Sequence, residues 1–246
     1  LISDLSIIKR LTNLENLILN RNQIKNLLPI KQLTSLKRLS LYKNQIDDLS
    51  ELKELTSLTS LTLSRNQISD LSPINELTSL TTLLLSQNQI SDISPIKKLN
   101  QLKTLYLWRN DISDISPVKE LTFLIDLNLS FNQITHIEPI KKLTSLNNLD
   151  LSFNKIADIF QFEFIIPLKE LNIKIHENPI ARDHKISPNE DSNHYDTIVN
   201  ELLKQKELNK KKQTSDYTLP AKVLLLGNTQ SGKSTMMDYL LQENEP

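Results

Sequence analysis

The chain has 246 residues, enough for one or two domains, and its 29 basic and 29 acidic residues give a formal net charge of zero. This balance gives no reason to expect nucleic acid or an anionic membrane as a partner, and no apolar run reaches the ~18 residues that a membrane span needs. The chain has no cysteine, which favours a reducing compartment, so a cytoplasmic location is expected. It begins at Leu1 and ends without completing an element, so we expect it to be part of a longer protein.

An asparagine returns every 22 residues, preceded each time by three leucines and followed by an isoleucine. One such unit cannot bury its own leucines, whereas stacked units bury a continuous apolar column. Self-similarity at roughly 20–29 residues with this pattern is the signature of leucine-rich repeats. The sequence therefore predicts an α/β fold over residues 1–180: a solenoid with a parallel sheet on its concave face and a ladder of stacked asparagines. The ladder positions are Asn22, Asn44, Asn66, Asn88, Asn110, Asn132 and Asn154.

The segment that returns to the next strand reads like Asp92-Ile93-Ser94-Pro95. It is typical of a short helix or 3₁₀ turn on the convex side, with Ser94 as its cap and Pro95 as its first residue. Most repeats have an aspartate where Asp92 stands, and we interpret it as bonding its own turn rather than a cation. After Asn154 the pattern slips, so that either His176 or Asn178 fits the ladder. An atypical repeat of this kind indicates a terminal cap.

Residues 181–220 are interpreted as a loop, a helix and a linker. The loop covers 181–194, where the sequence is polar and aperiodic. Beyond it, apolar residues at helical spacing predict an amphipathic helix that ends near Glu207 and packs on the last repeat or on a following domain. These residues are Tyr195, Ile198, Val199, Leu202 and Leu203. The lysine-rich stretch that follows is interpreted as a solvated helix end or connector.

The last segment, 221–246, carries a second motif. A buried-strand pattern over 221–226 runs into Gly-x-x-x-x-Gly-Lys-Ser and then into a helix-like stretch, which is the context of a phosphate-binding P-loop. Backbone amides of such a loop hold phosphate oxygens, Lys233 would reach the outer phosphates, and Ser234 would ligate Mg²⁺. The chain's two glycines both stand at positions that the motif requires. The predicted nucleotide-binding residues are Gly227, Asn228, Thr229, Gln230, Ser231, Gly232, Lys233, Ser234 and Thr235.

The repeats resemble the 22-residue class of bacterial internalins. The order of repeats, short helix and P-loop resembles Roco proteins, in which such repeats precede a Ras-like Roc GTPase domain. That resemblance implies a GTP-binding signalling protein with GTP or GDP and Mg²⁺ as cofactors, and 221–246 as the truncated start of its Roc domain. A single strand, loop and helix lack the rest of a nucleotide domain, so this segment is expected neither to hold a cofactor nor to act as an enzyme.

Two other functions remain open. The same P-loop could belong to an ATP-using NTPase with a repeat sensor, because the Gly-Lys-Ser-Thr ending occurs in ATPases as well. Alternatively the chain could be a non-enzymatic repeat scaffold or adhesin. A homodimer is also possible.

The strand positions between the leucines are expected to point outward on the concave face, where a protein partner would bind. Aromatic side chains and arginine dominate interface energies, and exposed aromatics in a row are unusual on a surface that binds nothing. Packing of the rings on one another alone is the alternative. The predicted partner-binding residues are Tyr42, Tyr106, Trp108, Arg109, Phe131 and Phe153.

Overall fold

The computed structural model describes residues 1–168, 170–186 and 193–216. It divides the chain into two compact units, Leu1–Leu202 and Leu203–Pro246, which are considered separately below. The predicted P-loop and its flanking strand and helix lie outside the described residues. No helix among the described residues is long and apolar enough to cross a membrane.

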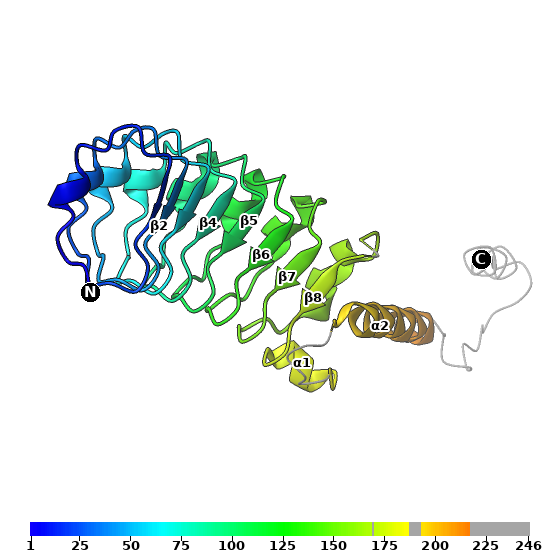
Figure 1. Ribbon diagram of the computed structural model, residues 1–246. Coiled ribbons are helices and arrows are strands. Elements are labelled where there is room, and N and C mark those ends of the chain that lie inside the picture. The colour runs from blue at the N-terminus through cyan, green and yellow to red at the C-terminus, as the bar shows by residue number, and fades with distance from the viewer. Residues whose placement is uncertain (169, 187–192, 217–246) are drawn as a thin grey trace, which may run out of the picture. The chain divides into compact units, whose positions relative to one another are not determined.

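Within the first unit, eight short strands form one parallel sheet in chain order (Figure 1). Neighbouring strands pair in a register of one repeat, as where Leu61 lies opposite Leu83. The predicted parallel sheet is therefore confirmed, and the repeat length itself sets the register. The strands are β1 Asn16–Ile18, β2 Arg38–Ser40, β3 Ser60–Thr62, β4 Thr82–Leu84, β5 Thr104–Tyr106, β6 Asp126–Asn128, β7 Asn148–Asp150 and β8 Asn172–Lys174.

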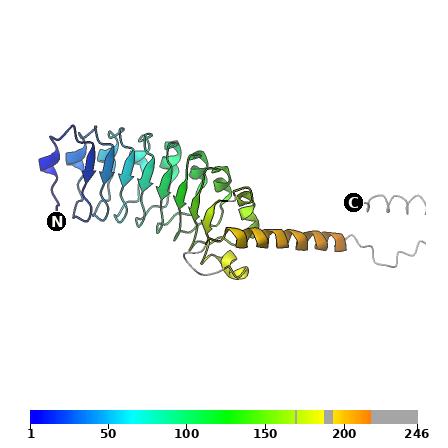
Figure 2. The same cartoon turned by 45° about the vertical axis from the view of Figure 1, so that its right-hand side comes forward.

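Short 3₁₀ helices, labelled η, lie in the segments that return each repeat to the next strand (Figure 2). Five of them have proline as the second residue, three of these after serine as predicted, because proline lacks the amide that a first turn leaves unpaired. The expected short helical turns are confirmed. They are η1 Ser6–Ile8, η2 Leu28–Ile30, η3 Ser50–Leu52, η4 Ser72–Ile74, η5 Ser94–Lys98, η6 Ser116–Glu120, η7 Glu138–Lys142 and η8 Ile159–Ile165.

The cap of these turns differs from the prediction. Ser94 is the first helical residue and Pro95 the second, and the flanking Ile93 makes no side-chain cap bond. Instead the Ser94 amide donates to Oδ1 of Asp92 at 2.7 Å. A short carboxylate reaches an amide two residues ahead without disturbing the turn, which is why aspartate recurs at this position. This confirms the interpretation that the recurring aspartate bonds its own turn.

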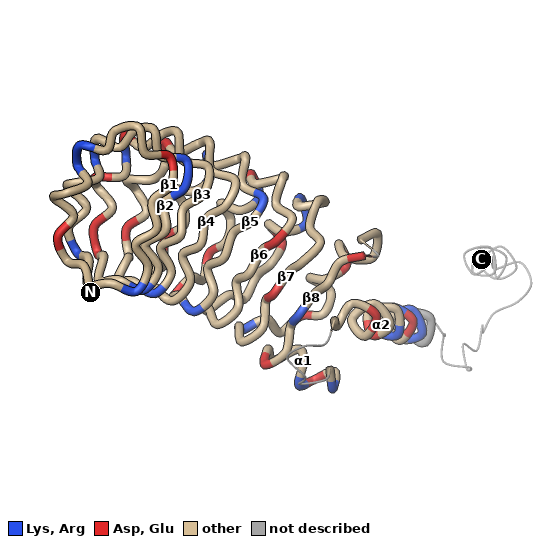
Figure 3. The backbone as a smooth tube through the Cα atoms, viewed as in Figure 1, with Lys and Arg blue, Asp and Glu red and all other residues tan. Residues whose placement is uncertain are grey.

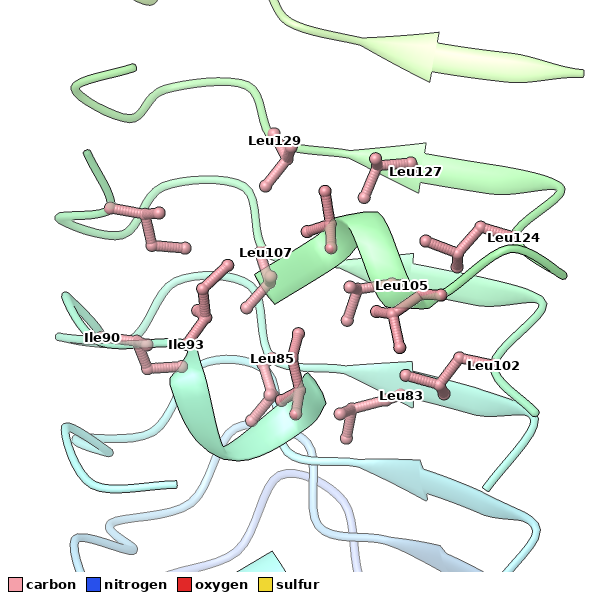
Figure 4. Packing of buried hydrophobic residues seen from close by; sticks show 14 of the residues in the cluster. Leu83, Leu85, Ile90, Ile93, Leu102, Leu105, Leu107, Leu124, Leu127 and Leu129 are labelled. Atoms are coloured by element: carbon pink, nitrogen blue, oxygen red, sulfur yellow. The ribbon is translucent and has the colours of Figure 1, made fainter. Parts of the chain in front are cut away.

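The core is a stack of leucine and isoleucine side chains between the sheet and the 3₁₀ helices (Figure 4). Leu83, Leu105 and Leu127 point inward from three consecutive strands, and each is at most 2% exposed. Leu85, Leu107 and Leu129 follow them two residues later and are fully buried. Each layer is covered only by its neighbours, so the repeats stabilise one another rather than themselves.

The asparagine ladder joins each repeat to the one before it. Asn110 accepts a bond from the Ile90 amide at 3.0 Å and donates to the carbonyls of Leu85 at 3.2 Å and Leu107 at 2.9 Å. The same pattern ends at Asn178, which accepts from Ile156 at 3.0 Å. Of the two residues that the sequence left open, Asn178 is therefore the ladder residue. The longer η8 takes up the two extra residues of this repeat, so the strand and ladder keep their register.

The carboxyl-terminal edge of the sheet is covered by side chains. Ile173 of β8 donates its amide to Oδ1 of Asn193 at 3.0 Å, and Ile175, the residue after β8, donates its amide to Nδ1 of His194 at 3.1 Å. The His194 amide donates to the Ile173 carbonyl at 2.8 Å. An open strand edge is a template for pairing with another chain, and these two residues occupy it.

Among the residues that the structure describes, two α-helices follow the sheet. Helix α1 (Pro179–Asp183) occupies the start of the segment predicted as a loop, because Pro179 is suited to a first helical position. Helix α2 (Tyr195–Asp216) begins on the last repeat, where Ile198 and Leu202 are fully buried, as predicted. It runs nine residues beyond its predicted end near Glu207, because its Lys, Glu and Gln residues favour a helix and no glycine or proline interrupts them. In the second unit its described side chains from Leu203 to Lys211 are mostly exposed.

Candidate partner-binding face

The outward side of β1–β8 and of the residues that follow each strand is called the sheet face below. Its residues alternate with the buried leucines, because successive side chains of a strand point to opposite sides. Tyr106 and Trp108, for example, are half-buried and flank the buried Leu107. The sequence prediction that these positions point outward is confirmed.

Three of the predicted partner-binding residues lie together. The rings of Phe131 and Phe153 stack with centroids 3.9 Å apart and planes 12° from parallel. The Arg109 guanidinium carbon lies 5.4 Å from the Phe131 ring centre on the other side, within the range of a cation–π interaction. His176 meets Phe153 edge-on at 5.1 Å. We call Arg109, Phe131, Phe153 and His176 the aromatic column.

His176 was not predicted as part of this surface. It stands where the two preceding repeats have Ser130 and Ser152, and its Nδ1 is 2.9 Å from the hydroxyl of Ser152. It is 4% exposed, so it supports Phe153 from the buried side. The signal was present in the sequence, since His176 stands two residues before Asn178. To recognise His176 as a surface residue from the sequence, one would have had to take Asn178, and not His176, as the next ladder residue.

Tyr42 lies apart from the column. It occupies the position of Trp108 three repeats earlier, which places the two residues roughly 14 Å apart at ~4.8 Å per strand. Its ring instead lies 5.6 Å from the guanidinium carbon of Arg65. The six predicted residues therefore do not form one group: Arg109, Phe131 and Phe153 lie together, and Tyr42 lies apart from them.

The residue before each ladder asparagine has a left-handed backbone. Arg109 has φ 58°, and Phe131 and Phe153 both have φ 54°. Outside glycine this conformation costs roughly 1–2 kcal/mol, and it is rare for bulky residues. The asparagine that follows is bonded on three sides, which holds the turn in this shape. The turn thus presents a side chain at the same place in every repeat, one strand spacing from the next.

A shallow depression of about 260 Å³ lies on the sheet face over β5–β8. Asn148 donates a side-chain hydrogen bond to Asp126, and Asn172 donates to Asn148 at 3.2 Å. Burial of Tyr106, and secondarily the charge of Asp126, raise the pKa of its hydroxyl. The depression is lined by Tyr106, Asp126, Asn128, Asn148, Asp150, Asn172 and Lys174 above the buried Leu127 and Leu149.

The predicted nucleotide-binding residues 227–235, including the magnesium ligand Ser234, lie outside the described residues. Among the residues that are described, no group of three or more His, Cys, Asp or Glu side chains could hold a metal ion.

Models of the leucine-rich repeat match most of the solenoid. A two-copy repeat model matches residues 12–54, 34–76 and 78–120, and a second leucine-rich-repeat model matches 100–156. No curated protein matches the chain significantly.

Three bacterial proteins of known structure have similar folds. An internalin, InlF, from Listeria monocytogenes is 38% identical with a TM-score of 0.70, over 76% of this chain and 56% of its own. Internalin C2 of the same species is 32% identical with a TM-score of 0.68, over 71% of this chain and 76% of its own. A leucine-rich-repeat protein of Leptospira interrogans is 35% identical with a TM-score of 0.63, over 70% of this chain. The chain spans only 56% of InlF and 45% of the Leptospira protein.

Proposed function

Because this chain belongs to the leucine-rich-repeat proteins, with repeats of the bacterial internalin type, we propose that it is a protein-interaction module that binds its partner on the sheet face. The observation that carries the proposal is the aromatic column. Phe131 is 38% exposed and sits between Arg109 and Phe153 on a rigid, repetitive scaffold. Arginine and aromatic side chains are the residues that most often dominate binding energy at interfaces.

The scaffold favours binding because it has little to reorganise. The column lies on turns that are held by the ladder, so a partner would meet side chains that are already in place. Association is costly when loops and side chains must be ordered at the interface, and a preformed surface avoids much of that cost. Tyr106 at the end of β5 and Trp108, two residues later, lie on the same sheet face.

The experiment is a binding comparison among exposed phenylalanines. The 246-residue chain is used to isolate binding proteins, and the affinity of each recovered partner is measured by calorimetry for variants of the chain. The double substitution Phe131→Ala, Phe153→Ala is expected to weaken binding at least tenfold, as is typical of hot-spot residues. Phe123→Ala is the matched control, because Phe123 is 55% exposed but precedes β6 and lies outside the column. Equal affinity of the double variant and the wild type would contradict the proposal.

We propose as a second function that the repeats precede a P-loop nucleotide-binding domain, as in Roco GTPases. Support for this comes from the sequence of Gly227 to Ser234 and its position after the repeats. The family models end at residue 156, so the repeat module by itself, as a scaffold or adhesin, has the broader support. A guanine-nucleotide partner, Mg²⁺ and a cytoplasmic location belong to this second proposal.

Calorimetric titration with GTP, GDP and ATP tests the second function. In the complete protein, GTP and GDP are expected to bind with Mg²⁺ and ATP to bind much more weakly. Lys233→Ala is expected to abolish binding by removing the charge that faces the phosphates, while the circular dichroism of the repeats stays unchanged. Preference for ATP would instead assign the motif to another class of NTPase, and no binding of any nucleotide would leave the repeats as a scaffold.

A further inference from the structure

Charge is unevenly distributed on the sheet face. The outward residues of β3, β4 and β5 are uncharged, whereas β6 and β7 carry Asp126 and Asp150 and β8 carries Lys174. Figure 3 shows these acidic segments on two adjacent strands. The residues lie beside the half-buried Tyr106, at the depression described above. This end of the sheet face is therefore a depression that carries two carboxylates and has the Tyr106 ring on one side.

The two carboxylates are bonded but not neutralised. Asp126 accepts a bond from the Asn148 amide group, and Oδ1 of Asp150 accepts from the Ser152 backbone amide at 3.0 Å. Neither aspartate forms an ion pair with a residue in the described part of the chain. Lys174 lies opposite Asp150 in the strand register, yet its ammonium group makes no ion pair with that carboxylate.

We propose that this depression receives the guanidinium group of an arginine from a partner segment that lies across β5–β8. The inference rests on the proposed function, that the sheet face binds a protein. A guanidinium presents planar donors that match carboxylate oxygens, and its face stacks on aromatic rings. Asp126 and Asp150 supply the acceptors, and Tyr106 supplies the ring.

A cation fits this surface better than a neutral ligand does. Asp126 and Asp150 are both half-buried, so a ligand that covers them removes two charges from water. Such desolvation is unfavourable unless an opposite charge replaces the lost water. A neutral sugar could use the same amides and ring but would leave both charges uncompensated.

The test is an NMR titration of the 246-residue chain with a blocked tripeptide that has arginine at its centre. The matched ligand is the same tripeptide with citrulline, which keeps the shape and loses the charge. We expect the arginine peptide to shift the resonances of Tyr106, Asn128 and Asn148 and to bind at least tenfold more tightly than the citrulline peptide. Equal affinities of the two peptides, or maltose shifting these resonances when the arginine peptide does not, would overturn the proposal.

Charge variants locate the contact. The double variant Asp126→Asn, Asp150→Asn preserves size and hydrogen bonding, and it is expected to weaken arginine binding at least tenfold with an unchanged circular dichroism spectrum. Lys174→Met removes the competing cation and is expected to strengthen binding by about threefold. Unaltered binding in the double aspartate variant contradicts the assignment.

Failure here is separable from failure of the proposed function. The peptide titration needs no partner protein, whereas the Phe131 and Phe153 variants are read out with the partner itself. If those variants lose the partner while the arginine peptide does not bind, the sheet face remains the interface and only the arginine site is wrong. If they retain the partner, the proposed function fails whatever the peptide does.

Discussion

The ring of Phe131 lies parallel to that of Phe153 at a centroid distance of 3.9 Å, although the two residues are 22 positions apart in the sequence. Both leave the chain from a left-handed turn with the same φ of 54°. Identical backbone geometry in consecutive repeats points the two side chains the same way, one strand spacing apart. Face-to-face stacking is thus a consequence of repetition, and any aromatic pair at this position in adjacent repeats should stack likewise.

The first prediction concerns the left-handed position itself. Lys43 has φ 56° and an exposed side chain, so Lys43→Gly removes the steric cost of this backbone. Glycine also gains entropy in the unfolded chain, and we expect a net increase in unfolding free energy of roughly 0.5–1 kcal/mol, measured by urea titration. Lys53→Gly is the control. Lys53 has φ −57°, so glycine relieves no steric cost there and the variant should be less stable than the wild type. Destabilisation of both variants by the same amount would contradict this explanation of the turn.

A second prediction tests the ladder. Asn110→Ala leaves the Ile90 amide and the carbonyls of Leu85 and Leu107 without their partner in the interior. Loss of a buried hydrogen-bonding partner costs roughly 1–3 kcal/mol, which should appear as a lower urea midpoint. Asn100→Ala, at an exposed asparagine outside the ladder, is expected to change it little. If the two variants unfold at the same urea concentration, the ladder contributes less than its geometry indicates.

The third prediction concerns acid. Hydrogen bonds from the hydroxyl and the amide of Ser50 lower the pKa of Asp48, and serines do the same for Asp70 and Asp114. A carboxyl whose pKa is lower in the folded state stabilises the fold above its unfolded pKa, and this stability is lost as pH falls through the folded value. The melting temperature should therefore decrease as the pH falls below about 4.

The control for this acid effect already exists in the sequence. Asn26 occupies the same position as Asp48 and accepts from the Leu28 amide at 2.9 Å, so an amide can replace the carboxylate. The triple variant with asparagine at 48, 70 and 114 should fold at pH 7 and lose less stability between pH 5 and 3 than the wild type. An equally steep decrease in the triple variant would assign the acid sensitivity to other carboxyls.

The fourth prediction uses Tyr106 as a reporter of the depression. Burial raises the pKa of its hydroxyl above 10.0, and the charge of Asp126 adds to the effect. Asp126→Asn removes only the second cause, so the pKa should fall and yet remain above the ordinary value. The measurement is a pH titration of the assigned Tyr106 ring carbons by NMR in the wild type and in the variant. A pKa of Tyr106 that does not change in the variant would place Asp126 too far away to act on it.

Much of the solenoid followed from its period. The 22-residue interval predicts the strands, their parallel pairing, the buried leucines and the short turns, because each repeat experiences the same neighbours on both sides. The outward positions of Tyr106 and Trp108 follow from strand alternation. The grouping of Arg109, Phe131 and Phe153 was visible as well, since all three precede a ladder asparagine.

The remainder depended on packing that no period encodes. The two extra residues of the last repeat could lie before or after the strand, and only the structure places them in η8. The edge cover by Asn193 and His194 joins residues about 20 positions from the strand they bond, in a segment without repeats. The depression arises from the relative size of Tyr106 and its asparagine neighbours, which a one-dimensional pattern does not contain.

The cover on β8 also has a consequence for what can be added to this end of the array. A parallel stack whose last strand displayed free amides would accept a further repeat from any chain, and copies could add end to end as a filament. Asn193 and His194 occupy that edge with two side-chain acceptors and with the backbone amide of His194. A further strand would have to displace these bonds before it could pair with β8, so the cover disfavours end-to-end addition of another chain.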